Sequence, residues 1–376
     1  MRSPVRELEA KVHQAKTAGE CLAALLDLAN LHAAEFRNRE GLRSAREALN
    51  IARARNDAGA VGRALAAATL CHYQRGDYIA AVATGLDAVA AYADDDRPGR
   101  SAALLSVALA LHCVKASELA QVTAEQAVAD AVEASDVLRE ANARSVMGVI
   151  LADRGKPREA RRQFRAAAAR YREAGDTLRV KKATSNIGHT YRYQGNTESQ
   201  EGKPALAAMR WKQARRVYET ALRSATTPAD DAIVLGALAE CECRLGELDV
   251  ARAHAEQALA LAVEVPLIQA PCHLWHARIL QAQGDLKAAE RASERAREAA
   301  VRLEHGEVLA TCLLLQSKLN DLQGRFETAQ DLERRAREVT LEREAELARV
   351  REELALVWER YAMPTPAKRD RSPRAA

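Results

Sequence analysis

The feature that most constrains the fold is a pair of alanines, seven residues apart, that recurs along the chain inside amphipathic segments. The first members follow one another at intervals of 36 to 40 residues, with one interval of 54. Seven residues make two turns of an α-helix, so each pair marks one helix face that a neighbour can approach closely. Such a period predicts an array of stacked units. The eight pairs are Ala45/Ala52, Ala81/Ala88, Ala120/Ala127, Ala160/Ala167, Ala214/Ala221, Ala251/Ala258, Ala289/Ala296 and Ala329/Ala336.

A glycine lies five residues before the first alanine in five units, at Gly76, Gly155, Gly246, Gly284 and Gly324. Glycine between two apolar helical runs favours a left-handed residue that ends one helix and opens a tight antiparallel turn. Units one and three have Glu40 and Lys115 at this position. Pro157 and Pro204 are expected to begin second helices, and Pro271 to lie near the start of a first helix, so that no proline falls in a helix interior.

The composition agrees with a helical fold and argues against several other classes. Aromatic residues make up 4% of the chain, and strong helix formers dominate. The net charge of +4 is concentrated in the last residues, so the nearly neutral body argues against a nucleic-acid platform. The seven cysteines include no CxxC pair, no signal peptide opens the chain and no run of 18 apolar residues occurs. We therefore expect reduced thiols in a cytoplasmic protein and no spanning helix.

These units resemble the tetratricopeptide repeat. The resemblance is carried best by Met147-Gly148, Leu151, Gly155, Ala160, Phe164 and Ala167 in unit four, and by Ile187-Gly188, Tyr191, Gly195, Ala214, Tyr218 and Ala221 in unit five. It implies an all-α, right-handed superhelical solenoid of about eight antiparallel helix-turn-helix repeats with a long C-terminal helix. The period exceeds the usual one of about 34 residues. The lengthened units are similar to those in bacterial signalling and regulatory proteins of this family.

The expected organisation has four parts. A short capping helix occupies residues 1–19, and the repeat array occupies residues 20–340, with an insertion near 196–209. Residues 341–362 continue a long C-terminal helix, and residues 363–376 form a basic tail that we expect to be disordered.

The interval of 54 residues contains about 14 extra residues. The segment Asn196–Lys203 is polar and turn-prone, so we predict a loop there, followed from Pro204 by a second helix several turns longer than its neighbours. The insertion is either a tolerated surface loop or a protrusion that binds a specific partner.

The C-terminal helix has an apolar seam at Leu347, Val350, Leu354, Val357 and Tyr361, with alternating spacings of three and four. This spacing places one apolar stripe along a helix. The helix either folds back to cap the last repeat or pairs with a second copy as a coiled coil, which would give a homodimer.

Stacked helical hairpins leave a concave groove lined by the first helix of each unit. The resemblance places Asn186 as a peptide-backbone clamp, and Lys or Arg side chains beside it suit a carboxylate. Glu240 is the acidic exception, and the alternative is that these are ordinary solvated residues. The candidates in the same helical phase are Lys182, Ser185, Asn186, His189 and Arg192 in unit five, with Arg63, Tyr73, Asn142, Arg278 and Lys318 in other units.

No motif for catalysis or for cofactor binding occurs, and Cys272, His273 and His276 are too few to predict a metal site. We therefore expect neither an enzyme nor a cofactor. The first hypothesis is a scaffold or adaptor that captures a protein or peptide, acidic or bearing a carboxylate. The alternative is a sensory or regulatory module of a bacterial signal-transduction system, associated with a diguanylate cyclase or kinase and lacking its own output domain. An enzyme with an unrecognised site is the third hypothesis.

Overall fold

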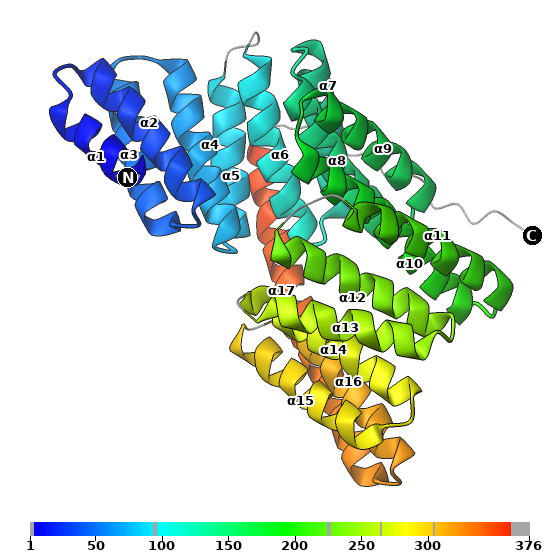
Figure 1. Cartoon of the computed structure of the whole chain (residues 1–376). Helices are drawn as coiled ribbons and strands as arrows, with labels where there is room; N and C mark the ends of the chain where they lie inside the picture. Colours follow the sequence, from blue (N-terminus) through cyan, green and yellow to red (C-terminus); the bar gives the residue numbers. More distant parts are fainter. Residues whose placement is uncertain (1–3, 93–95, 224–226, 264, 304, 362–376) are drawn as a thin grey trace, which may run out of the picture. The chain divides into compact units, whose positions relative to one another are not determined.

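The chain is all-α, as the repeat pattern predicts. A computed structural model describes residues 4–92, 96–223, 227–263, 265–303 and 305–361, and these residues form seventeen α-helices and no strand. Figure 1 shows successive helices joined by tight turns and packed side by side in chain order within each part of the chain. The basic tail at 363–376 lies outside the described residues.

The described residues fall into two compact units, a division that the sequence does not mark. Unit 1 holds the residues up to Arg154 together with those from Leu347 onward, and unit 2 holds Gly155–Glu346. Unit 1 contains α1 (Pro4–Gln14), α2 (Ala18–Ala34), α3 (Asn38–Ala54), α4 (Ala58–Gln74), α5 (Tyr78–Ala91), α6 (Arg97–Cys113), α7 (Ser117–Glu133) and α8 (Val137–Asp153). Unit 2 contains α9 (Pro157–Glu173), α10 (Thr177–Gln200), α11 (Pro204–Leu222), α12 (Pro228–Arg244), α13 (Leu248–Ala262), α14 (Pro266–Ala282), α15 (Leu286–Arg302) and α16 (Gly306–Leu322). The last helix, α17 (Phe326–Arg360), begins in unit 2 and ends in unit 1.

The paired alanines lie at the contacts between helices. All sixteen are at most 3% exposed, on the second helix of each repeat from α3 to α17. Side chains this small let neighbouring helix backbones approach closely, and each repeat covers the apolar face of the next. At the start of the array, α1 packs on α2 with Val5 buried.

The turn glycines adopt the left-handed conformation that their spacing predicts. Gly76, Gly155, Gly246, Gly284 and Gly324 have φ between 71° and 86°. In the turns at Gly76, Gly175 and Gly284 the next residue is an aspartate, whose side chain accepts a hydrogen bond from the backbone N–H three residues later. A left-handed residue thus ends one helix and a side-chain cap begins the next.

Units one and three make the same turn without glycine. Lys115 has φ of 63° at the predicted position. In unit one the turn residue is Phe36, with φ of 58°, and Glu40 lies inside α3. The placement of Glu40 at the turn is wrong because α3 begins at Asn38, seven residues before its first paired alanine.

Among the described residues, the prolines lie in the first turn of a helix except at position 271. Pro157 and Pro204 are the first residues of α9 and α11, as predicted. Pro271, however, lies inside α14, which begins at Pro266. The expectation of no interior proline is therefore wrong. Position 271 removes the amide that would bond the carbonyl of Leu267, and Leu267 is 73% exposed, so water can replace that partner.

The extra residues of unit five lengthen its first helix. α10 has 24 residues, against 17 in α12 and α14, while α11 has 19. The loop predicted from Asn196 is wrong because α10 continues to Gln200. The polar residues there have partners: the Asn196 amide donates to Glu240 at 3.0 Å, and Glu198 accepts from Arg210 at 3.3 Å.

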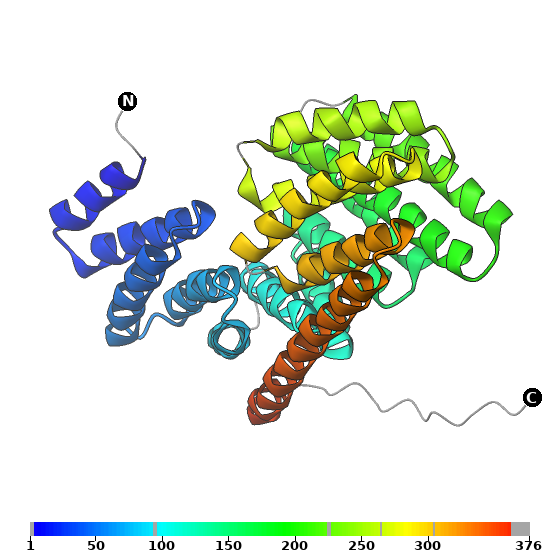
Figure 2. The same cartoon turned by 90° about the horizontal axis from the view of Figure 1, so that it is seen from below.

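α17 is a single helix of 35 residues that serves both units. Its first part is the second helix of repeat eight, where the Ser317 hydroxyl donates to the carbonyl of Ala329 at 2.9 Å. Figure 2 shows it continuing without a break. Beyond Leu347 the helix belongs to unit 1, where Leu354 is 1% and Trp358 2% exposed.

Hydrogen bonds from Arg351 and from Tyr361, the residue after α17, join this last part of the chain to unit 1. Arg351 Nη1 donates to the carbonyl of Val114 at 3.2 Å, and the Tyr361 hydroxyl donates to Asp87 at 2.5 Å. Part of the apolar seam predicted from the sequence is therefore buried in unit 1, at Leu347 and Leu354, while Val350 and Val357 are half-buried.

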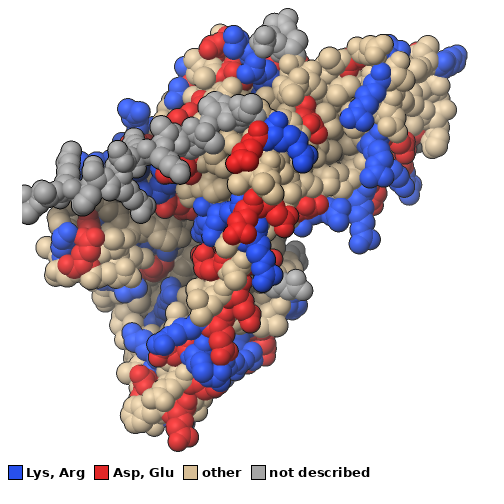
Figure 3. Space-filling model, turned by 180° about the vertical axis from the view of Figure 1, so that it is seen from behind, with Lys and Arg blue, Asp and Glu red and all other residues tan. Residues whose placement is uncertain are grey.

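None of the described helices is long and apolar enough to cross a membrane. On the face shown in Figure 3, Lys and Arg side chains are interspersed with Asp and Glu.

Candidate functional site

A groove of about 790 Å³ opens on unit 2 across the first helices of repeats five to eight. α12 packs beside α14, and α14 beside α16, so their side chains can line one surface. The groove combines aromatic, aliphatic and charged groups. Its lining residues are Ser199, Trp211, Glu240, Cys243, Arg244, Trp275, Arg278, Ile279, Gln281, Ala282, Thr311, Leu314, Leu315, Lys318 and Leu322.

One wall of the groove is a buried polar network around Glu240. The Arg192 guanidinium forms an ion pair with Glu240, and the Asn196 amide donates to its other oxygen at 3.0 Å. The indole N–H of Trp211 donates to Asn196 Oδ1, also at 3.0 Å. Burial opposes ionisation of Glu240, but Arg192, Arg278 and the Asn196 amide outweigh it and lower its pKa. Glu240 is therefore a carboxylate already satisfied by the protein.

Behind this wall, the half-buried His189 pairs with the buried Tyr218. Their rings meet edge to face at 5.3 Å between centroids. Burial, with Arg192 nearby, lowers the pKa of His189 to about 3, so the ring is neutral and Nδ1 accepts the Tyr218 hydroxyl at 2.8 Å. Gly188 allows this arrangement, because a Cβ there would lie 2.5 Å from the Tyr218 ring.

Three cations in the groove have no ion pair among the described residues. They are Arg244 on α12, Arg278 on α14 and Lys318 on α16. Arg278 is half-buried, and burial lowers its pKa; Arg244 and Arg192 lower it further, while Glu240 opposes them. Because Glu240 is held by Arg192, the groove has an excess of positive charge that an anionic ligand would neutralise.

The structure divides the ten residues predicted to line a groove. Arg278 and Lys318 line this one. Arg63, Tyr73 and Asn142 lie in unit 1, where Tyr73 contacts Tyr78 with ring centroids 6.4 Å apart.

The remaining five predicted residues are on α10, and the side chains of most of them interact with other residues of the protein. Lys182 is exposed but forms an ion pair with Asp230 at 3.3 Å. Ser185 is 6% exposed, and its hydroxyl donates to the carbonyl of Lys181. His189 and Arg192 belong to the pairs described above. Asn186 is half-buried and makes no side-chain hydrogen bond to the described residues. Among the five α10 candidates it is therefore the one whose polar group is available to a ligand.

Two groove residues and one residue of the polar network beside the groove were not predicted from the sequence. Arg244 lies four residues after Glu240, and Trp275 lies three residues before Arg278. These spacings place Arg244 and Trp275 one helical turn from Glu240 and Arg278, on the same helix faces. Including residues one turn from each predicted position would therefore have identified both. Asn196 lies in the polar segment predicted to be a loop, so the helical phase of the groove residues does not extend to it.

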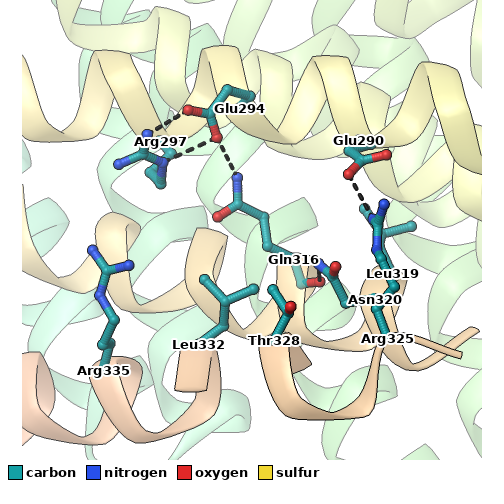
Figure 4. Close-up of a pocket in the computed structure, with 10 residues that line it drawn as sticks. All are labelled: Glu290, Glu294, Arg297, Gln316, Leu319, Asn320, Arg325, Thr328, Leu332 and Arg335. Carbon is teal, nitrogen blue, oxygen red and sulfur yellow. Dashed lines mark hydrogen bonds and ion pairs between the residues drawn. The ribbon is translucent and has the colours of Figure 1, made fainter. Parts of the chain in front are cut away.

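A second cavity of unit 2, about 660 Å³, lies among α15, α16 and α17. Figure 4 shows its two glutamates already engaged. Glu294 accepts from Arg297 Nε at 3.0 Å and from Gln316 at 2.8 Å, and Glu290 pairs with Arg325 at 2.6 Å. Its charges are largely compensated within the protein, so the groove is the better candidate site.

No metal site is visible in the described part of the chain, where no three His, Cys, Asp or Glu side chains are placed to hold an ion. All seven cysteines are free thiols. Burial raises the pKa of Cys241 and Cys272 to about 12, which disfavours the reactive thiolate.

Comparison with known proteins supports the repeat assignment. The family model described as tetratricopeptide repeat matches residues 269–342. Residues 269–342 are thus tetratricopeptide-repeat sequence. The matched residues include α15, α16 and the Arg278 and Lys318 part of the groove. No curated protein sequence matches the chain.

Solved structures extend the repeat fold over most of the chain. The quorum sensor NprR from B. thuringiensis is 13% identical, with a TM-score of 0.61 over 89% of this chain and 92% of that one. A Rap protein complexed with competence and sporulation factor is 16% identical, with a TM-score of 0.56 over 92% and 100%. The Rap conjugation gene regulator of plasmid pLS20, complexed with the Phr* peptide, is 12% identical, with a TM-score of 0.54 over 93% and 96%. At these identities the likeness shows the fold alone.

Proposed function

We propose that the chain is a non-catalytic binding protein whose unit 2 groove captures an acidic peptide or protein segment. The observation that carries the proposal is the set of three groove cations, Arg244, Arg278 and Lys318, without an ion pair among the described residues. A carboxylate would be held there by charge-assisted hydrogen bonds, and the arginine fork matches its planar geometry.

The energetics favour a carboxylate over a neutral ligand. A half-buried guanidinium that lacks a partner has lost part of its hydration, and a bound carboxylate restores its hydrogen bonds. One hydrogen bond to a charged group contributes about 1.5–3 kcal/mol. One solved neighbour, named as a complex with the Phr* peptide, supports a peptide as the ligand of this fold. The seven free thiols support a cytoplasmic location.

Selection from a display library of random 12-residue peptides tests the proposal. The full chain should enrich peptides rich in Asp and Glu, and Arg278→Glu should shift the enrichment toward Lys and Arg. Arg291→Glu is the matched control, since Arg291 is exposed, lies outside the groove and gives the same change in net charge. Equal peptide sets from the wild type and Arg278→Glu would refute the groove assignment. Turnover of a nucleotide, ester or peptide that is lost on mutation of a groove residue would refute the non-catalytic role.

A regulatory module is the second candidate, favoured by neighbours whose names describe a quorum sensor and a gene regulator. In that case a selected peptide should change the recovery of a protein partner from native extract, whereas a plain scaffold would recover the same partners with or without it. Deleting the end of α17 cannot distinguish the scaffold from the regulatory module, because the deletion would remove Leu354 and Trp358 from the core of unit 1.

A further inference from the structure

The floor of the groove contains an aromatic ring held in a fixed position. Trp275 on α14 is half-buried and lines the groove. A Cβ at Gly236 of α12 would lie 1.9 Å from its Cε3 atom, so the ring lies directly against the α12 backbone. The indole N–H makes no hydrogen bond to the described residues. A ring seated in this way is a preorganised surface for a ligand side chain.

Opposite this ring, α16 presents aliphatic side chains to the same groove. Leu314 is 51% and Leu322 is 56% exposed, and Lys318 lies between them at intervals of four residues. Residues four apart share one helix face about 5–6 Å from one another. Exposed leucines at this spacing in a groove, beside a tryptophan, are typical of a binding surface.

Each of two groove helices therefore pairs an apolar side chain with a cation one turn away. On α14 the pair is Trp275 and Arg278, and on α16 it is Leu314 and Lys318. A ligand complementary to both pairs needs an apolar group and a carboxylate at a similar separation. In an extended peptide, side chains on one face are two residues and roughly 6.6–7 Å apart.

We propose that the ligand is anchored by one bulky apolar side chain packed on Trp275 between Leu314 and Leu322. This inference rests on the proposed function. An Asp or Glu two residues from this anchor reaches Arg278 or Lys318. The ligand class is thus an acidic peptide with an aliphatic or aromatic anchor, and Trp275 determines the anchor's specificity.

The peptide library tests this inference position by position. Wild-type protein should select a bulky apolar residue with an acidic residue two positions away. Trp275→Ala should lose the apolar preference, keep the acidic one and bind the best selected peptide about tenfold more weakly in fluorescence anisotropy. Gly236→Ala, which forces the ring from its seat, should have the same effect.

Because Trp275 also packs on the core, a surface variant keeps the inference testable if Trp275→Ala fails to fold. Leu314→Ser with Leu322→Ser alters exposed groove residues only, and Leu267→Ser is the control, being 73% exposed and outside the groove. The double variant should lose the apolar preference, and the control should keep it. Two results would overturn the anchor but leave the proposed function standing. In the first, the wild type enriches acidic residues without any apolar position. In the second, the apolar preference is present but unchanged by these variants. No acidic enrichment at all overturns both.

Discussion

Replacing Leu354 by alanine tests whether the end of α17 is part of the core of unit 1. Leu354 is 1% exposed, so the substitution removes buried methyl groups and leaves a cavity. Substitutions of this kind lower the free energy of unfolding by about 2–5 kcal/mol. Leu356, two residues later on the same helix, is 67% exposed. Leu356→Ala should change the free energy by no more than about 0.5 kcal/mol.

Hydrogen exchange measured by mass spectrometry locates the effect. In Leu354→Ala, peptides from α5 and α6 should exchange faster, since Arg351 and Tyr361 bind Val114 and Asp87 at those helices. Peptides from α12 in unit 2 should exchange at the wild-type rate. The reasoning is refuted if Leu354→Ala and Leu356→Ala have equal stability, or if α5 and α6 exchange as in the wild type.

Three further predictions concern turns and charges. Gly246→Ala should lower the free energy of unfolding by about 1 kcal/mol in urea titration, because a Cβ is strained at φ of 86°; wild-type stability would contradict this. The hydrogen bond that the His254 ring donates to Glu242 raises the pKa of His254 above 6.5, so the pair stabilises the fold at low pH and the benefit disappears as pH rises through the folded-state pKa. His254→Gln should therefore lower Tm more at pH 5.5 than at pH 8, and an equal loss would count against the pair. Arg192→Met should lower the free energy of unfolding by about 3–5 kcal/mol, because it leaves Glu240 buried and unpaired. Adding Glu240→Leu should restore much of that stability. A double variant as unstable as Arg192→Met would contradict the importance of the pair.

The helices and their contacts were predictable because local rules determine them. Alanine pairs such as Ala160/Ala167 report a buried helix face, and glycines such as Gly155 report a left-handed turn. Both signals depend on residues close in sequence. The turns at Phe36 and Lys115 show the limit, because lysine and phenylalanine carry no preference for φ above zero and so do not mark a left-handed residue in the sequence.

The groove was only partly predictable because its composition depends on long-range pairing. Arg192 shares the predicted phase with Arg278, yet it pairs with Glu240, 48 residues away, and is buried. Asn196 looked like a loop residue until Glu240 and Trp211 supplied its partners. The seam of α17 was visible in the sequence, whereas nothing local identifies Val114 or Asp87 as its contacts.

The route of α17 has a consequence for synthesis. Unit 1 combines the first 154 residues with a segment that begins at Leu347, so it stays incomplete until everything between them has been translated. At 5–20 residues per second, the ribosome takes roughly 10–40 s over that stretch. During this interval the surface of unit 1 that Trp358 later covers is exposed to water on the nascent chain. Chaperones can bind that surface until the final helix emerges and covers it.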